Sequence, residues 1–153
     1  MIKADVLITN KSWQKYIKVP EPYINKKLKK IEKKINIFRK NSCNFTLLLS
    51  GDSEIKKLNI KFRKKNKITD ILSFPFYERK FLVKLLKKKK SNIYLGDIII
   101  NLNKIKNKNE SFNLSFDKIW IHGLVHLLGY RHKSNLDFSI MRKLESKLLQ
   151  SIK

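Results

Sequence analysis

Residues 120–132 read Trp-Ile-His-Gly-Leu-Val-His-Leu-Leu-Gly-Tyr-Arg-His, and they contain all three histidines of this 153-residue chain. They overlap residues 115–128, a segment that is apolar on nearly every side, which is typical of a buried helix. Histidines on such a helix need partners, because an unpaired imidazole in an apolar site costs about 1–3 kcal/mol. The stretch therefore predicts a buried central helix whose histidines are either satisfied within the core or bound to a metal.

The spacing of the histidines favours the metal. His122 and His126 are four positions apart, so on a helix their Cβ atoms lie on one face, about 5–6 Å from each other. Gly129 is placed to end this helix, because glycine adopts the left-handed conformation of a C-terminal cap without steric cost. The turn would bring His132 back to the other two and leave a fourth ligand position open, as in catalytic zinc sites.

The composition limits the class of protein. The length and the hydrophobic content of 42% predict one domain, residues 1–153. Cys43 is the single cysteine of the sequence, so we expect no disulfide partner and a reducing compartment. The N-terminus has no signal-peptide pattern, and no run of about 18 apolar residues predicts a membrane span. These features indicate a soluble, cytoplasmic protein.

The charge of the chain is strongly positive, with 36 Lys+Arg against 12 Asp+Glu and a formal net charge of +24. Such a charge attracts polyanions, and nucleic acid is the natural partner. Because nearly all the cations are lysines in a chain rich in Ile and Asn, an AT-rich coding sequence explains the charge equally well. The densest basic run, Lys87, Lys88, Lys89 and Lys90, is a candidate RNA contact. Alternatively, residues 79–90 form a mobile, solvated connector, which we slightly favour.

The remaining chain alternates short strands with helices. We expect strands at residues 4–9, 45–49, 71–75 and 95–100, and the last should be central because its apolar run is continuous. One helix follows Pro20 and Pro22. The apolar spacing predicts two further helices with these buried faces: Ile55, Leu58 and Phe62 in the first, and Leu136, Ile140, Leu144 and Leu148 in the second.

Gly123 and Arg63 distinguish between possible chemistries. The three histidines and Gly129 have the spacing of the extended zinc motif of metzincin proteases, but those enzymes need Glu directly after the first histidine as general base. Gly123 occupies this position, which argues against peptide hydrolysis, and the positive charge favours a phosphodiester substrate. Arg63 is either a surface arginine or a phosphate ligand, for which lysine is no substitute because only a guanidinium binds phosphate with two parallel hydrogen bonds.

Four blocks of the sequence, in this order, closely resemble the YbeY family of bacterial endoribonucleases and ribosomal RNA maturation factors. They are Leu58-Asn59 to Arg63, Thr69-Asp70-Ile71-Leu72-Ser73-Phe74-Pro75, Leu95-Gly96-Asp97-Ile98, and His-Gly-Leu-Val-His-Leu-Leu-Gly-Tyr-Arg-His at 122–132. Residues 1–40 and 79–93 match only loosely. The resemblance implies an α/β (α+β) single domain, with a mixed four-stranded β-sheet surrounded by helices and a metal site on a buried helix and the following turn.

The resemblance also implies a function. It implies one zinc per chain, bound by His122, His126 and His132, with catalytic Arg63 beside the metal. The implied substrate is single-stranded RNA, including ribosomal RNA of the small ribosomal subunit, in maturation and ribosome quality control. The family usually has Asp before the third histidine, where this chain has Arg131. The alternatives are a non-catalytic ribosome-assembly protein with a structural metal and, less favoured, a zinc metalloprotease.

Overall fold

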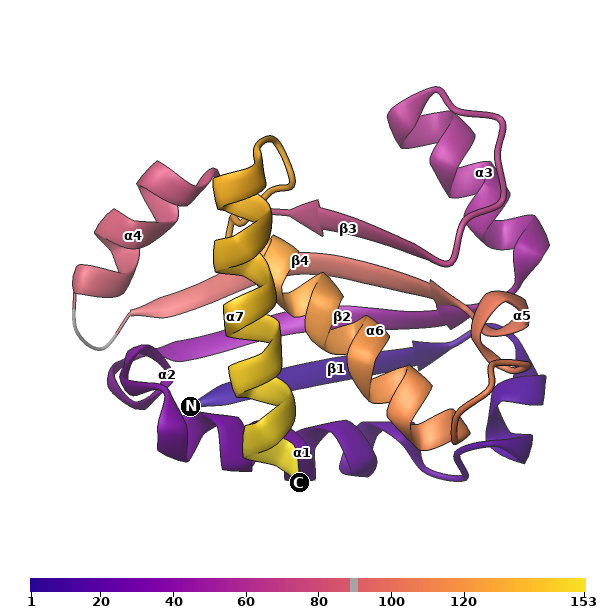
Figure 1. Cartoon of the computed structure of the whole chain (residues 1–153), viewed down its shortest axis with the longest axis horizontal. Coiled ribbons are helices and arrows are strands. Elements are labelled where there is room, and N and C mark those ends of the chain that lie inside the picture. Colours follow the sequence, from indigo (N-terminus) through magenta and orange to yellow (C-terminus); the bar gives the residue numbers. More distant parts are fainter. Residues whose placement is uncertain (89–90) are drawn as a thin grey trace.

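A mixed β-sheet lies at the centre of the structure, a computed structural model that describes residues 1–88 and 91–153 (Figure 1). Within these ranges four strands form one sheet in the order β1-β2-β4-β3: β1 (Ile2–Ile8), β2 (Ser42–Ser50), β3 (Ile71–Pro75) and β4 (Asn92–Asn101). Neighbours β1 and β2, and β2 and β4, pair in parallel, whereas β3 pairs with β4 antiparallel. The predicted α+β fold with a mixed four-stranded sheet is confirmed.

Strand β4 is an inner strand, as its continuous apolar run predicts. Successive side chains of a strand point to opposite faces of the sheet, so both faces of β4 need apolar cover. Ile98 and Ile100 belong to the main core, whereas Ile99 packs with Leu72 and Ile55 in a second, smaller cluster. Helices therefore lie against both faces of the sheet.

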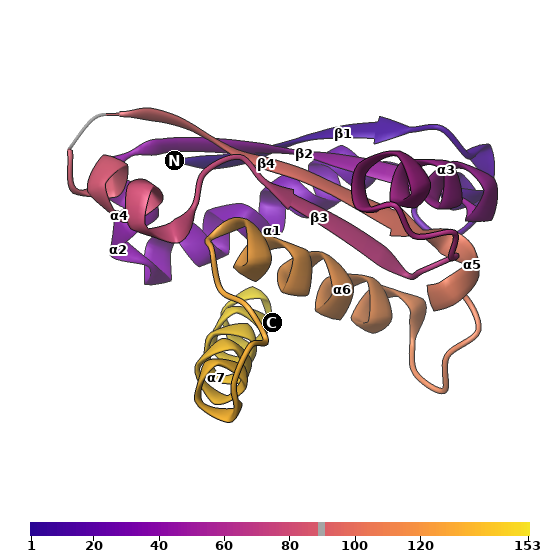
Figure 2. The same cartoon turned by 90° about the horizontal axis from the view of Figure 1, so that it is seen from above.

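The helices divide unevenly between the two faces. The described part of the chain holds a 3₁₀ helix, η1 (Lys11–Lys15), and seven α-helices: α1 (Pro20–Lys34), α2 (Asn36–Lys40), α3 (Asp52–Arg63), α4 (Arg79–Lys87), α5 (Leu102–Ile105), α6 (Phe112–Leu127) and α7 (Asn135–Ile152). In Figure 2, α1 and α6 lie under one face of the sheet and α7 lies farthest from it. Ile55 of α3 belongs to the smaller cluster on the other face. In the described ranges, no helix combines the length and apolar character needed to cross a membrane.

Helix α6 is the buried helix that the sequence predicts. The side chain of Ser111 caps its N-terminus by accepting a hydrogen bond from the backbone amide of Leu114. The buried Asp117 accepts hydrogen bonds from Trp120 Nε1 at 3.0 Å and from Tyr23 of α1 at 3.1 Å. The contact with Tyr23 joins α6 to α1, and the histidines of α6 are thus carried by a helix that is held in place on the core.

Residues 79–87 form helix α4, so the solvated connector expected there was wrong for this part. Leu82 is buried, and Leu85 and Leu86, three and four positions later, pack against the main core. This apolar stripe has helical period and stabilises α4 against the end of the sheet. Lys87 and Lys88 stay exposed at the end of α4, and Lys89 and Lys90 lie outside the described residues.

The buried faces of α3 and α7 differ from the prediction. Leu136 and Ile140 are 70% and 44% exposed, and Phe62 of α3 is 59% exposed. In α7, each four-residue step of the predicted row turns about 40° beyond a full helical turn, so the row winds off one face. The buried residues of α7 are Met141, Leu148 and Ile152.

Candidate metal centre

The three histidines meet at the C-terminal end of α6. His122 and His126 lie on that helix, His132 follows it, and one ring nitrogen from each lies within 4.8 Å of the others. The Nε2 atoms of His122 and His126 are 3.1 Å apart. Two nitrogen ligands of a tetrahedral zinc at its usual bond length are about 3.3 Å apart, so these rings stand close to metal-binding positions.

The other ring nitrogens of the two helical histidines are hydrogen-bonded. Nδ1 of His122 donates to Oε1 of Glu145 at 2.7 Å, and Nδ1 of His126 donates to the backbone carbonyl of Tyr130 at 2.9 Å. A neutral ring that donates through Nδ1 carries a lone pair on Nε2. With their Nδ1 atoms engaged in this way, the two rings turn their Nε2 atoms towards each other, where one cation could bind between them.

The environment of His126 favours its neutral, metal-binding form. Burial, followed by the neighbouring His122, lowers the pKa of His126 from its usual 6.5 to about 4. Neutral imidazole is the form that binds metals, because its Nε2 lone pair is free. Three imidazoles, with His126 held in its neutral form, thus fit a divalent metal such as zinc.

Glu145 is the residue of this site that the sequence analysis missed. It lies on α7, 23 positions beyond His122. Its signal in the sequence was a single acidic residue in the middle of a basic helix. Carboxylates that accept from a metal-binding histidine orient the ring and raise its basicity. Here α7 supplies this contact, so the packing of α7 on α6 positions a candidate metal ligand.

We expect Glu145→Ala to weaken zinc binding about 10–100-fold, because His122 loses the partner that orients its ring. Glu145→Gln should lose less, since the amide oxygen still accepts the Nδ1 hydrogen bond. Zinc titration against a competing chelator measures both. Asp137→Ala is the matched control, since it removes the other carboxylate of α7. Equal affinities for Glu145→Ala and the control would show that Glu145 does not support the site.

The histidines open into a cleft of about 680 Å³ between the end of α6, strand β3 and the segment that links α3 to β3. Of the described residues that line it, four are cationic and one, Asp70, is acidic. The cationic residues are Arg63, Lys65, Lys67 and Arg131. Such a cleft attracts an anionic substrate towards the histidines.

Arg63 lines this cleft together with the three histidines, and its catalytic role stays a prediction. Its Nη2 atom donates to the backbone carbonyl of Ser73 at 2.8 Å, and its guanidinium carbon lies 5.4 Å from the centre of the Phe74 ring. Both contacts hold the guanidinium at the free edge of β3. A guanidinium has five N–H donors, so donors remain for a phosphate.

Asn59, one helical turn before Arg63, has a structural contact with the cleft wall. It is 3% exposed, and its Nδ2 atom donates to the carbonyl of Lys67 at 2.9 Å. Asn101 donates to the carbonyl of Thr69 at 3.2 Å. These two amides fix the segment between α3 and β3, and with it the lysines that line the cleft.

Positions 123 and 131 bear on the chemistry of the site. A Cβ atom at Gly123 would lie 2.9 Å from Ile98 Cγ2 and 3.0 Å from Ile71 Cδ1. The side-chain direction at Gly123 therefore points into the sheet, where a Glu would have no room to serve as the general base of a protease. Arg131 is exposed and lines the cleft, so it adds positive charge beside the histidines.

Lys87 and Lys88, at the end of α4, are not among the residues that line the cleft. Lys89 and Lys90, which complete this basic run, are outside the described ranges. The RNA contact suggested for this run stays a prediction.

Comparisons with known proteins agree with the motifs and the fold. The family model described as Endoribonuclease YbeY matches residues 7–153. A protein of Pelagibacter ubique named Endoribonuclease YbeY is 46% identical over 100% of this chain and 97% of its own length. A relative of the same name from Thermodesulfovibrio yellowstonii is 41% identical over 84% of this chain and 77% of its own.

A solved structure supports the fold independently. The solution structure of a Thermotoga maritima protein superposes with a TM-score of 0.57 at 22% identity and covers 99% of this chain and 89% of its own. The family model spans β2, the four motif blocks and the histidine cluster together. The resemblance read from the motifs is thus confirmed, and the chain belongs to the endoribonuclease YbeY family.

Proposed function

We propose that residues 1–153 form one metal-dependent endoribonuclease domain that cleaves single-stranded RNA. The relatives named above are endoribonucleases by name, and this activity suits a strongly cationic chain. The observation that carries the proposal is the cluster of three imidazoles, with the Nε2 atoms of His122 and His126 3.1 Å apart, at a cationic cleft that also contains Arg63.

The residues of the cleft have distinct roles in this proposal. One zinc per chain, bound by His122, His126 and His132, would supply a Lewis acid and lower the pKa of a bound water. Arg63 binds the scissile phosphate and stabilises the negative charge that develops on its oxygens. Glu145 orients the His122 ring by accepting the hydrogen bond from its Nδ1 atom.

The lysines of the cleft bind the RNA backbone without regard to sequence. Lys65 and Lys67 lie on the segment fixed by Asn59 and Asn101, so their charges are held beside the scissile position. Binding through phosphates weakens steeply with salt, because each contact releases counterions. We propose ribosomal RNA of the small ribosomal subunit as the substrate, in maturation and ribosome quality control in the cytoplasm.

Metal removal tests the proposal directly. The purified chain should contain about one zinc, lose cleavage of a single-stranded RNA oligonucleotide on chelation, and regain it when zinc is added back. Metal content and cleavage are measured on the same sample. Bound zinc without cleavage of either oligonucleotides or ribosomal RNA fragments would contradict the nuclease and favour a structural metal.

Arg63→Lys should lower kcat/KM for RNA about 100–1000-fold, because an ammonium group cannot donate two parallel hydrogen bonds to the phosphate. The zinc content should not change, since Arg63 has no contact with the histidines among the described residues. Arg39→Lys is the matched control, because Arg39 is an exposed residue of α2. Retained activity in Arg63→Lys would remove Arg63 from the proposed mechanism.

A further inference from the structure

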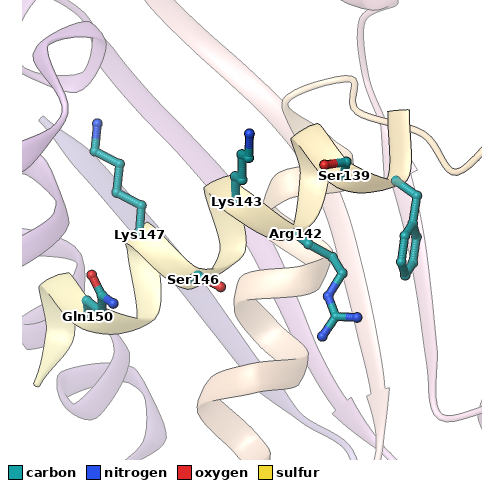
Figure 3. A pocket seen from close by; sticks show the side chains of 7 residues that line it. Ser139, Arg142, Lys143, Ser146, Lys147 and Gln150 are labelled. Atoms are coloured by element: carbon teal, nitrogen blue, oxygen red, sulfur yellow. The ribbon is translucent and has the colours of Figure 1, made fainter. Parts of the chain in front are cut away.

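The outward face of α7 forms a groove of about 530 Å³ that we call the α7 groove (Figure 3). Its residues lie at helical spacing along one side of α7, and those that matter here are Phe138, Arg142, Lys143, Ser146, Lys147 and Gln150. In Figure 3, Lys143 and Lys147 extend from one side of the helix and Arg142 from the other. The groove is therefore bordered by cations along both sides.

The α7 groove begins at the histidine cluster. The ring of Phe138 lies 5.5 Å from the ring of His132, and the guanidinium carbon of Arg142 lies 5.5 Å from the Phe138 ring. Phe138 is nevertheless 45% exposed. From Phe138 to Gln150 the helix rises about 18 Å. The groove thus leads away from the proposed catalytic centre over a length that accommodates several nucleotides.

No acidic side chain of the described residues neutralises the cations of the α7 groove. Among the described residues, Arg142, Lys143 and Lys147 form no salt bridge. Glu145, on the same helix, is directed to His122 and leaves their charge uncompensated. An exposed aromatic ring followed by unpaired cations is the pattern that binds single-stranded nucleic acid, because bases stack on the ring while cations contact phosphates.

Positive charge alone does not distinguish α7, because α1 also carries exposed lysines. Lys29 and Lys33 project from α1, but the neighbouring aromatic residue, Tyr23, is half-buried and donates its hydroxyl to Asp117. What sets the α7 groove apart is an exposed ring in contact with the histidine cluster. The α1 lysines therefore provide a matched control.

We propose that the α7 groove binds the segment of single-stranded RNA next to the scissile phosphate, with a base stacked on Phe138 and phosphates on Arg142, Lys143 and Lys147. The proposal rests on the proposed function, since it uses the same catalytic centre. It adds a defined path for the substrate and a reason for preferring single strands, because a duplex has no free base to stack on Phe138.

The test compares three variants of the full chain: Phe138→Ala, the double variant Arg142→Ala/Lys147→Ala, and the control Lys29→Ala/Lys33→Ala. Fluorescence anisotropy gives the Kd for a labelled single-stranded 12-mer across a salt series, and steady-state cleavage gives kcat and KM. We expect Phe138→Ala to weaken single-strand binding about tenfold with little effect on a matched duplex. The double variant should reduce the slope of log K against log salt by about 1.4, and both should raise KM.

The results distinguish a failure of this proposal from a failure of the proposed nuclease activity. If the groove variants match the α1 control in Kd, salt slope and KM while the chain cleaves RNA, the α7 groove is not the RNA path. If polyglutamate competes as well as RNA, the groove is a general polyanion surface and the proposal also fails. If no RNA is cleaved at all, the proposed function fails, whereas Kd and salt slope still decide the groove.

Discussion

Replacing His126 with alanine should leave a folded protein with almost no bound zinc and with RNA cleavage reduced on the order of a thousandfold or more. In the proposed site His126 would be the central ligand, since its Nε2 atom faces His122 at 3.1 Å and its ring lies 5.0 Å from that of His132. Removing it leaves two ligands, which bind zinc weakly. The three measurements are metal content by mass spectrometry, RNA cleavage, and circular dichroism with thermal unfolding.

Whether the His126→Ala variant stays folded distinguishes a catalytic metal from a structural one. Helix α6 is fixed by buried apolar residues and by Asp117, whereas the His126 ring is hydrogen-bonded to Tyr130 and His122. We therefore expect His126→Ala to keep its circular dichroism spectrum and its affinity for RNA. Wild-type protein stripped of metal is the control and should behave in the same way. An unfolded His126→Ala variant would instead indicate a metal that holds the segments together, as in the assembly-factor alternative.

The parts of the fold with a strong local signal could be predicted from the sequence. The continuous apolar run of β4 and the all-round apolar character of α6 both follow from burial on every side. The histidine spacing placed two rings on one face of α6, and Gly129, with a φ of 91°, ends the helix as expected. Each of these features depends only on residues close together in the sequence.

The parts that failed depend on contacts between distant segments. The partner of His122 comes from α7, and the rotation of α7 that brings Glu145 inward also exposes Leu136. Hydrophobic spacing alone could not fix this rotation, because it does not include the hydrogen bond between Glu145 and His122. Likewise, the inward position of Asn59 depends on the carbonyl of Lys67, which only the folded loop presents.

Gly129→Ala should destabilise the protein by about 2–4 kcal/mol and weaken the metal site at the same time. A positive φ costs alanine free energy, and a Cβ atom at this position would lie 2.5 Å from Arg79 Cβ and 2.9 Å from Arg79 Cα. The second contact is with backbone, so α4 itself must move. For a domain of this size, we expect the melting temperature to fall by about 5–15 °C.

The effect reaches the histidines through Arg79. This residue donates to the carbonyl of Leu128 at 2.8 Å and to the hydroxyl of Tyr130 at 3.0 Å, and so holds both sides of the turn. The carbonyl of Tyr130 in turn accepts from His126. Zinc titration and thermal unfolding of Gly129→Ala should therefore change together. Gly51→Ala is the control, because its Cβ meets the end of the Asn10 side chain, 2.7 Å away, and its φ of −127° suits alanine. A Gly129→Ala variant as stable as this control would show that the turn does not constrain the cluster.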